Sequence, residues 1–456
     1  MARNLITPAK NISSTDAVFI IIGIVIGAGI FRAPSLVAAN TGSDVTFFLT
    51  WVLGGLVSFI GALCYAELST AFPNTGGDYH FIRRAFGNRS AFLFAWARMS
   101  VIQTGSIALL AYIFGDYLSE LYRIGEHSSF IYAAAIIIIL TAINIAGLRF
   151  GTGTQRLFTL SEVGGVLLVI VVGLLYQAQP AMAEPLQQPG GSGSSLGMAM
   201  VFVLLTFGGW NEAAYISAEI KSGSRGMVKA LLISLLVITL LYVLINVAYI
   251  RVLGHGGLAG SSAAASDLMK IALGPSGGYI IGLLVAVSAL TSANATIFTG
   301  ARANYAMGKD FSAFSGLGKW NKRASGPVNA FLVQGGISLV LVTLGLFTRN
   351  GFETMIEYTA PVFWFFFFLT GVALFVLRKK EPDVHRPFRV PLYPFTPAIF
   401  CISSAYLLYS SLAYTGLGAL VGVAVLITGM VVLMALPGYG NATRLEQQTE
   451  VRAPSG

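Results

Sequence analysis

The sequence predicts an all-α polytopic membrane protein with about 12 transmembrane helices. Five helices and then five more are expected to form an inverted repeat, followed by two C-terminal helices. Three observations predict this fold. The chain has 55% hydrophobic and only 10% charged residues, whereas a soluble domain carries roughly 25% charged residues. Its apolar residues gather in segments of about 20, the length that crosses a bilayer. Segments one and six are both interrupted by glycines near their middle, as in transporters built from inverted repeats.

Each predicted transmembrane helix is an apolar stretch between polar loops. These helices are expected at residues 15–39, 45–71, 91–118, 129–148, 157–177, 196–219, 228–253, 276–306, 328–348, 356–378, 394–414 and 417–436. They define a first repeat at 15–177, a second repeat at 196–378 and a C-terminal pair at 394–436. Residues 1–14 and 437–456 are polar and are expected to be cytoplasmic. A short amphipathic helix is expected at the membrane surface, at residues 78–86.

The basic residues predict the orientation of the chain, because Lys and Arg concentrate in cytoplasmic loops. With the N-terminus inside, most of the 28 Lys and Arg residues fall in such loops. The exceptions outside are Arg123, Arg251, Lys270 and Arg349. Both termini are therefore expected in the cytoplasm. The net charge of +9 follows from these loops, so the expected partner is the lipid bilayer and not nucleic acid.

Gly27-Ala28-Gly29 interrupts the first predicted membrane helix. Glycine costs about 1 kcal/mol in a helix interior and proline about 3 kcal/mol, yet Gly23 and Pro34 flank the same short stretch. Irregular backbone at membrane depth is tolerated only where it is buried in protein or lines a cavity. We therefore interpret the stretch as a break that faces a substrate. The alternative is a continuous helix in which Gly23 and Gly27 form a packing face.

A matching interruption, Phe207-Gly208-Gly209-Trp210, falls in the sixth predicted helix. Spans one and six are the first members of the two halves. Interrupted segments in corresponding positions of two halves indicate a transporter binding site. The pair therefore favours a functional break over simple helix packing.

Two broken helices supply the groups that recognise a zwitterion. Free N–H groups at a helix start carry the positive end of the helix dipole and suit a carboxylate, whereas free carbonyls at a helix end suit an ammonium group. The sequence thus predicts an α-amino acid as the substrate. Trp210 could form an apolar wall or lid, or only pack. The predicted substrate-binding residues are Val25, Ile26, Gly27, Ala28, Gly29, Ile30, Leu205, Phe207, Gly208, Gly209 and Trp210.

Ionisable residues within membrane spans are candidates for function. Arg98 and Glu162 lie at a similar predicted depth, so we expect them to form an ion pair behind the substrate site. Alternatively, Glu162 carries a proton. Glu212, beside the second break, either complements a helix dipole or attracts a cationic substrate.

Other charged residues lie nearer the two membrane surfaces. Arg32 could form an outer gate with Glu357, or remain a solvated arginine. Glu67 and Glu219 lie near the cytoplasmic face, where we expect them to pair with loop arginines.

The few cysteines and histidines indicate no metal site, no cofactor and no disulfide framework. Cys64 and Cys401 both fall within apolar segments, and no pair of the four histidines has the spacing of zinc ligands. A membrane enzyme is disfavoured, because no cluster of His, Cys or Asp occurs at mid-membrane. A channel is disfavoured as well, because channels need repeated polar rings along a pore.

Several motifs resemble the amino acid–polyamine–organocation superfamily, and its L-type amino acid transporter branch in particular. They are Gly27-Ala28-Gly29-Ile30-Phe31, Tyr65-Ala66-Glu67-Leu68, Pro73-Asn74-Thr75-Gly76-Gly77-Asp78-Tyr79, Phe207-Gly208-Gly209-Trp210-Asn211 and Thr299-Gly300-Ala301-Arg302. The resemblance implies alternating access around spans one and six. It also implies that the substrate carboxylate meets Ala28 and Gly29, and that the amine meets carbonyls of Val25, Leu205 and Gly208.

Three departures from this family's pattern bear on function. Glu162 stands where many relatives have a lysine, and Leu205 stands where a gating aromatic is common. The loop at 119–128 lacks the cysteine that links eukaryotic relatives to a heavy chain, so we expect no such disulfide-linked partner.

The sequence thus predicts a plasma-membrane amino acid transporter, in a bacterial inner membrane, that works as an exchanger or as a proton-coupled symporter. The alternative within transport is a carrier of polyamines or cationic amino acids, suggested by Glu212.

Overall fold

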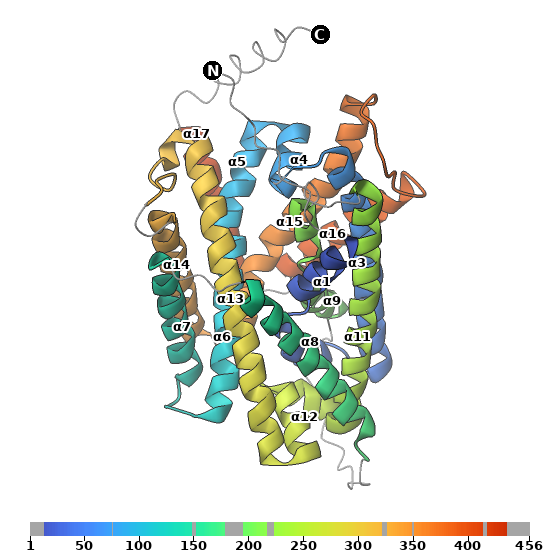
Figure 1. Cartoon of the computed structure of the whole chain (residues 1–456), viewed down its shortest axis with the longest axis vertical. Helices are drawn as coiled ribbons and strands as arrows, with labels where there is room; N and C mark the ends of the chain where they lie inside the picture. The colour runs from blue at the N-terminus through green and yellow to red at the C-terminus, as the bar shows by residue number, and fades with distance from the viewer. Residues whose placement is uncertain are drawn as a thin grey trace.

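The computed structural model describes residues 13–74, 76–147, 152–177, 195–216, 223–321, 326–348, 351–413 and 417–435. These ranges form a helical bundle (Figure 1). Its α-helices are α1 (Ser14–Val25), α2 (Ala33–Ala39), α3 (Asp44–Ala71), α4 (Gly77–Phe86), α5 (Asn88–Ala97), α6 (Gln103–Leu121), α7 (Ser128–Ile145), α8 (Thr152–Leu175), α9 (Leu196–Thr206), α10 (Ala213–Ile216), α11 (Gly223–Gly260), α12 (Ala264–Leu273), α13 (Pro275–Asp310), α14 (Val328–Leu344), α15 (Gly351–Lys380), α16 (Phe395–Ala413) and α17 (Leu417–Ala435).

The all-helical membrane class is confirmed. Within the described ranges, nine helical segments are long and apolar enough to cross a bilayer. Shorter apolar helices run over Leu160–Leu175 and Leu196–Thr206. The first predicted span is divided between α1 and α2, and the sixth between α9 and α10. Both therefore fall below the length of a continuous transmembrane helix, which is the consequence expected of mid-membrane breaks.

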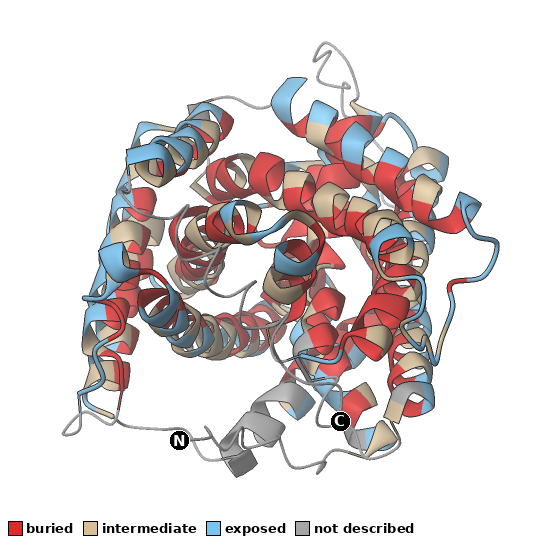
Figure 2. Cartoon of the chain, turned by 90° about the horizontal axis from the view of Figure 1, so that it is seen from above, coloured by how far each residue is buried: buried red, intermediate tan, exposed pale blue. Residues whose placement is uncertain are grey.

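Long continuous helices surround these divided ones. α11 packs against α1, α2, α3 and α8, whereas α13 packs along α6 and α8. α15 packs against α6, α16 and α17. Figure 1 shows α1 and α9 in the middle of the bundle. In the view along the bundle, buried residues face the centre and exposed residues face outward (Figure 2). The divided helices thus lie at the core of the molecule.

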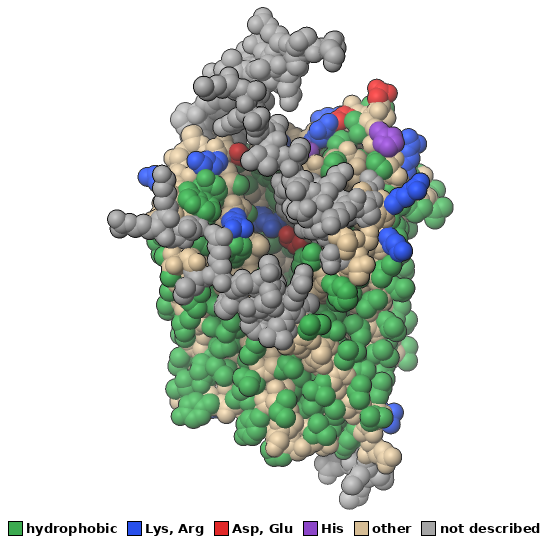
Figure 3. Space-filling view, viewed as in Figure 1, with side chains coloured by type: hydrophobic (Ala, Val, Ile, Leu, Met, Phe, Trp, Pro, Cys, Tyr) green, Lys and Arg blue, Asp and Glu red, His purple; other side chains and the backbone are tan. Residues whose placement is uncertain are grey.

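One end of the bundle is basic and the flank below it is apolar (Figure 3). The amphipathic helix expected at 78–86 is confirmed as α4. It buries Phe81, Ile82 and Ala85, whereas Arg83 and Arg84 are exposed. An apolar face with exposed arginines is the pattern of a helix at a membrane surface.

Glu67 fastens the loop between α15 and α16 to the end of α3. Its carboxylate accepts hydrogen bonds from Arg378 Nε (2.7 Å) and from the backbone N–H of Val390 (2.6 Å). Arg386 Nε lies 3.5 Å from Glu67 Oε1. The expected partnership with loop arginines is thus confirmed for Glu67. Glu219 lies outside the described residues.

Candidate substrate-binding site

The first helix break lies between Val25, where α1 ends, and Ala28, where a short 3₁₀ turn (Ala28–Phe31) begins. Gly27 between them is extended, with φ −119° and ψ −171°. The first N–H groups of a helical turn have no acceptor within it. Ala28 and Gly29 therefore present free donors in mid-membrane, and Pro34 at the start of α2 restarts the helix without needing an N–H partner. The predicted interruption at Gly27-Ala28-Gly29 is confirmed.

The second break begins after Thr206, where α9 ends, and it requires a glycine. Gly209 has φ +108°, which residues with a side chain rarely adopt. A Cβ atom at Gly209 would also lie 2.9 Å from Ile24 Cγ2 and 3.1 Å from the Ile24 carbonyl oxygen. Gly209 thus lets the second break approach the last turn of α1, so the two interruptions meet in space.

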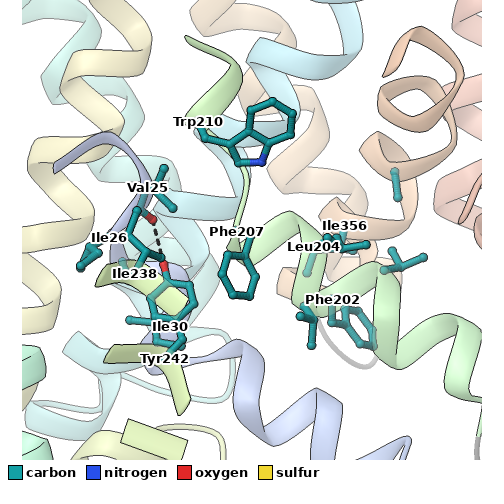
Figure 4. Packing of buried hydrophobic residues seen from close by; sticks show 14 of the residues in the cluster. Val25, Ile26, Ile30, Phe202, Leu204, Phe207, Trp210, Ile238, Tyr242 and Ile356 are labelled. Carbon is teal, nitrogen blue, oxygen red and sulfur yellow. Dashed lines mark hydrogen bonds between the residues drawn. The ribbon is translucent and has the colours of Figure 1, made fainter. Parts of the chain in front are cut away.

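Tyr242 of α11 contacts the ends of both broken helices. Its hydroxyl lies 2.9 Å from the Val25 carbonyl oxygen and 3.2 Å from that of Thr206. Figure 4 shows the contact with Val25 beside Phe207. A hydroxyl has one hydrogen to donate, so it can satisfy only one of the two carbonyls at a time. Sequence reasoning missed Tyr242, because nothing in a continuous apolar helix marks which tyrosine faces a break.

A cavity of about 430 Å³ lies where the two breaks meet. It is lined by both breaks and by residues of α6, α8, α13 and α15. Of the predicted substrate-binding residues, those that line it are Val25, Gly27, Ala28, Gly29, Leu205, Gly208 and Gly209. The backbone of both breaks therefore reaches the space that a substrate would occupy.

Four predicted site residues pack behind the cavity instead of lining it. Ile26 and Ile30 are fully buried. Phe207 packs against Tyr242, with ring centroids 5.0 Å apart. Trp210 packs against an aromatic cluster, its ring centroid 5.1 Å from that of Tyr65. Of the two roles considered for Trp210, the structure shows the packing role, because its large ring fills the core beside the break.

Two of the three predicted carbonyl acceptors already have partners. The Val25 carbonyl accepts from the N–H of Gly27 (2.9 Å) and from Tyr242. The Leu205 carbonyl accepts from the N–H of Gly208 at 3.0 Å. A carbonyl oxygen has two lone pairs. Leu205 therefore keeps one for a ligand, whereas Val25 would accept an ammonium group only after the Tyr242 hydroxyl turned to Thr206.

The predicted ion pair between Arg98 and Glu162 is wrong. Arg98 Nη2 lies 3.3 Å from Glu212 Oε1, and the two side chains are 15% and 36% exposed. Arg98 begins a π-helical turn, Arg98–Ile102, within the third span, and such turns are frequent at functional sites. A similar depth in the membrane did not identify the partner of Arg98, because the direction of a side chain also depends on how its helix is rotated about its axis.

Glu162 instead contacts hydroxyl groups of α13. Its Oε1 lies 2.9 Å from Ser288 Oγ and 3.3 Å from Ser292 Oγ. Glu162 is only 4% exposed, yet it is among the residues that line the cavity. Ser292 lies next to the first break, since a Cβ atom at Gly27 would be 3.8 Å from its Oγ.

Arg32 closes the end of the site opposite to α4. It is buried, its Nη1 donates to the Ser261 carbonyl oxygen at 3.0 Å, and its Nε lies 3.7 Å from Asp116 Oδ2. The observed ion pair is therefore with Asp116, and the predicted pairing with Glu357 is wrong. Glu357 packs against α17, where a Cβ atom at Gly418 would lie 2.9 Å from the Glu357 Cβ.

Asp78 of α4 is a cavity residue that sequence reasoning did not single out. It is 3% exposed and accepts hydrogen bonds from Tyr65 (2.5 Å) and Thr370 (3.3 Å). Burial raises the pKa of Asp78 to about 6, although the bond from Tyr65 opposes this shift. The only available signal was its place in the motif that ends at Tyr79.

A bundle of membrane helices in which two broken helices meet at a central cavity is the architecture of a secondary transporter. Comparison with known proteins agrees. The model of the family described as "Amino acid permease" matches residues 12–436, so the chain belongs to the amino acid permease family. The predicted superfamily membership is confirmed, and the family's members are transporters and not enzymes.

Named relatives cover most of the chain. The mouse (Mus musculus) b(0,+)-type amino acid transporter 1 is 30% identical over 406 residues, which cover 88% of this chain and 82% of the relative. The mouse large neutral amino acids transporter small subunit 2 is 30% identical over 436 residues, covering 92% and 80%. The human (Homo sapiens) form of the latter is also 30% identical over 436 residues, covering 92% and 79%.

Proposed function

We propose that this amino acid permease exchanges neutral α-amino acids across the membrane by alternating access. The observation that carries this proposal is the meeting of two helix breaks at one cavity. The free N–H groups of Ala28 and Gly29 would bind the substrate carboxylate. The carbonyls of Leu205 and Gly208 would bind its ammonium group, joined by Val25 once Tyr242 turns away.

Much of the cavity lining is uncharged, which favours a neutral substrate side chain. It includes polar residues such as Gln103, Ser106 and Thr296, and apolar residues such as Leu109 and Phe363. An amino acid side chain held there would meet both hydroxyl and apolar surface. One of the named relatives is a transporter of large neutral amino acids, which agrees with this assignment.

A carrier of cationic amino acids or polyamines is the second candidate. The carboxyl groups of Asp78, Glu162 and Glu212 line the cavity, against the single guanidinium of Arg98. Their combined charge would attract a cation. The ion pair between Glu212 and Arg98 weakens this attraction, so we rank the neutral substrate first.

The closed and open ends of the site support alternating access. Arg32 is buried and tied to α6 and to Ser261 at one end. At the other end, Arg98 and Glu212 remain partly exposed, and Figure 3 shows charged side chains within a hollow on that side. We assign the basic, open end to the cytoplasm by the distribution of Lys and Arg. Both termini would then be cytoplasmic and the conformation inward-facing.

We further propose a plasma-membrane location, in a bacterial inner membrane, the two five-helix repeats and no disulfide-linked heavy chain. The only cysteines, Cys64 and Cys401, are buried and free. They lie within α3 and α16, where a partner subunit has no access to them. An intersubunit disulfide would need a cysteine at an accessible surface.

A ligand screen tests the proposed substrate. A ligand that binds only the native state stabilises it by about 2.7 kcal/mol at 100 times its Kd. We expect neutral amino acids to raise the Tm of the purified protein, with smaller effects of arginine and putrescine. Stabilisation by arginine or putrescine alone would favour the cationic candidate, and stabilisation by none of these ligands would contradict both.

A further inference from the structure

Glu162 is an acidic residue that the binding of a zwitterion does not use. It lies on α8, is 4% exposed, and makes no ion pair with a basic side chain of the described residues. Arg156 stands outside this statement, because its side chain is not described. A charged carboxylate at membrane depth is costly, and such residues normally pair or take part in proton or ion movement. A charged Glu162 would therefore need a bound proton or another cation to balance its charge.

The hydroxyls around Glu162 stabilise a carboxylate, but they are too few to balance its charge. Ser288 and Ser292 both contact Oε1. Thr291 lies 3.5 Å from the same oxygen but 2.9 Å from the Ser288 carbonyl, so its single hydrogen goes to the carbonyl. Two neutral donors on one oxygen do not offset a full charge removed from water. A neutral Glu162 would use Oε1 as its carbonyl oxygen and carry a proton on Oε2.

The side chains around Glu162 favour a proton over a metal cation. Ser288 and Ser292 donate to its Oε1. Among the described residues, no group of three or more His, Cys, Asp or Glu side chains could hold a metal ion. A proton bound to the carboxyl group needs no such group to balance the charge.

In the part of the chain that the structure describes, few other titratable groups lie near Glu162. On α11, the Tyr242 hydroxyl interacts electrostatically with Glu162. Across the cavity, Asp78 and the Arg98–Glu212 pair share the same water-accessible space. α13 presents hydroxyls to Glu162. α12 also packs against α8, but its Lys270 pairs with Glu120 and Asp267 and not with Glu162.

We propose that Glu162 binds and releases one proton in each transport cycle, so that the permease performs net proton-coupled uptake in addition to exchange. Glu162 lines the cavity, so its proton can pass from Oε2 to cavity water and leave a carboxylate. Ser292 lies between Glu162 and Gly27. The charge on Glu162 is therefore linked to the first break, where substrate binds. This inference rests on the proposed amino acid transport.

Proteoliposomes that contain a pH-sensitive dye in the lumen test the proposal. In the wild type, adding a transported amino acid outside should acidify the lumen, with about one proton per amino acid, and an inward proton gradient should drive accumulation. Glu162→Gln should bind amino acid by thermal shift but lose luminal acidification. Glu120→Gln, a surface carboxyl paired with Lys270, is the matched control and should acidify the lumen like the wild type.

Ser288→Ala gives a second, milder test that does not remove the carboxyl. Loss of a donor to Oε1 disfavours the carboxylate, so the pH midpoint of uptake should move to higher pH. This variant also decides the matter if Glu162→Gln fails to insert. An unchanged midpoint in Ser288→Ala would then overturn the proposal.

The possible outcomes separate this inference from the proposed function. Amino acid movement without proton movement, at a rate that does not change between pH 5 and pH 8, would overturn proton coupling and leave amino acid transport intact. Uptake that follows a sodium gradient and not a proton gradient would overturn it too, as would luminal acidification in Glu162→Gln. Absence of any amino acid movement would instead contradict the proposed function.

Discussion

Replacing Gly29 with alanine should abolish tight substrate binding while the fold is kept. A Cβ atom at Gly29 would lie 3.9 Å from Thr206 Cγ2, which is ordinary van der Waals contact. The residue belongs to a helical turn and has no positive φ, so we expect little strain. The added methyl group would occupy cavity space beside the amides of Ala28 and Gly29.

The size of the effect follows from the hydrogen bonds that would be lost. A hydrogen bond to a charged group contributes about 1.5–3 kcal/mol. Losing one amide contact to a carboxylate therefore costs about 1.5–3 kcal/mol, which weakens binding about 10- to 150-fold, and losing both contacts weakens it further. The larger change Gly29→Val should act in the same direction.

Titration calorimetry with the best amino acid ligand measures this change, and the Tm without ligand reports folding. Gly42→Ala is the matched control, because no atom would lie within 4 Å of its Cβ and Gly42 does not line the cavity. Unaltered affinity in a folded Gly29→Ala protein would refute the assignment of the carboxylate to the first break. A much larger loss of Tm in Gly29→Ala than in Gly42→Ala would mean that the loss of binding reflects unfolding.

Three further predictions follow from the site. Gly209→Ala should lower stability by about 2–4 kcal/mol, because it combines a positive φ with a close contact to α1; thermal unfolding would show this, and an unchanged Tm would contradict it. Single charge reversal at Arg98 or Glu212 should reduce transport, and reversing both charges should restore part of it. If the double reversal restores no transport, the 3.3 Å contact between these side chains is not needed for function. The pKa of Asp78 is raised from 3.8 to about 6, so this group stabilises the native state at low pH and loses that effect as pH rises through 6. Lowering the pH from 7 to 5 should therefore stabilise the wild type by about 1 kcal/mol relative to Asp78→Asn; equal pH responses in thermal unfolding would contradict the shift.

The sequence was most informative where backbone chemistry alone decides the structure. Gly27, Gly29 and Gly209 weaken a helix, and their occurrence in matching positions of two spans favoured breaks over helix packing, so both breaks could be located without coordinates. The amphipathic pattern of α4 and the arginine partners of Glu67 followed from similar local rules. These features depend on residue type and on position along one helix.

The pairing of side chains could not be predicted in this way. Arg98 pairs with Glu212 and Arg32 with Asp116, although depth in the membrane suggested other partners. Trp210 packs in an aromatic cluster instead of facing the cavity. Each outcome depends on how far neighbouring helices are rotated about their axes. A single sequence fixes the approximate depth of a residue but not this rotation.

The central claim is that two helix breaks form one site that alternately faces the two sides of a membrane. The most direct test measures uptake of a labelled neutral amino acid into proteoliposomes, with and without unlabelled amino acid inside. The account predicts uptake that saturates with concentration and that speeds up when the lumen is preloaded. Uptake that rises linearly with concentration and ignores preloading would contradict it.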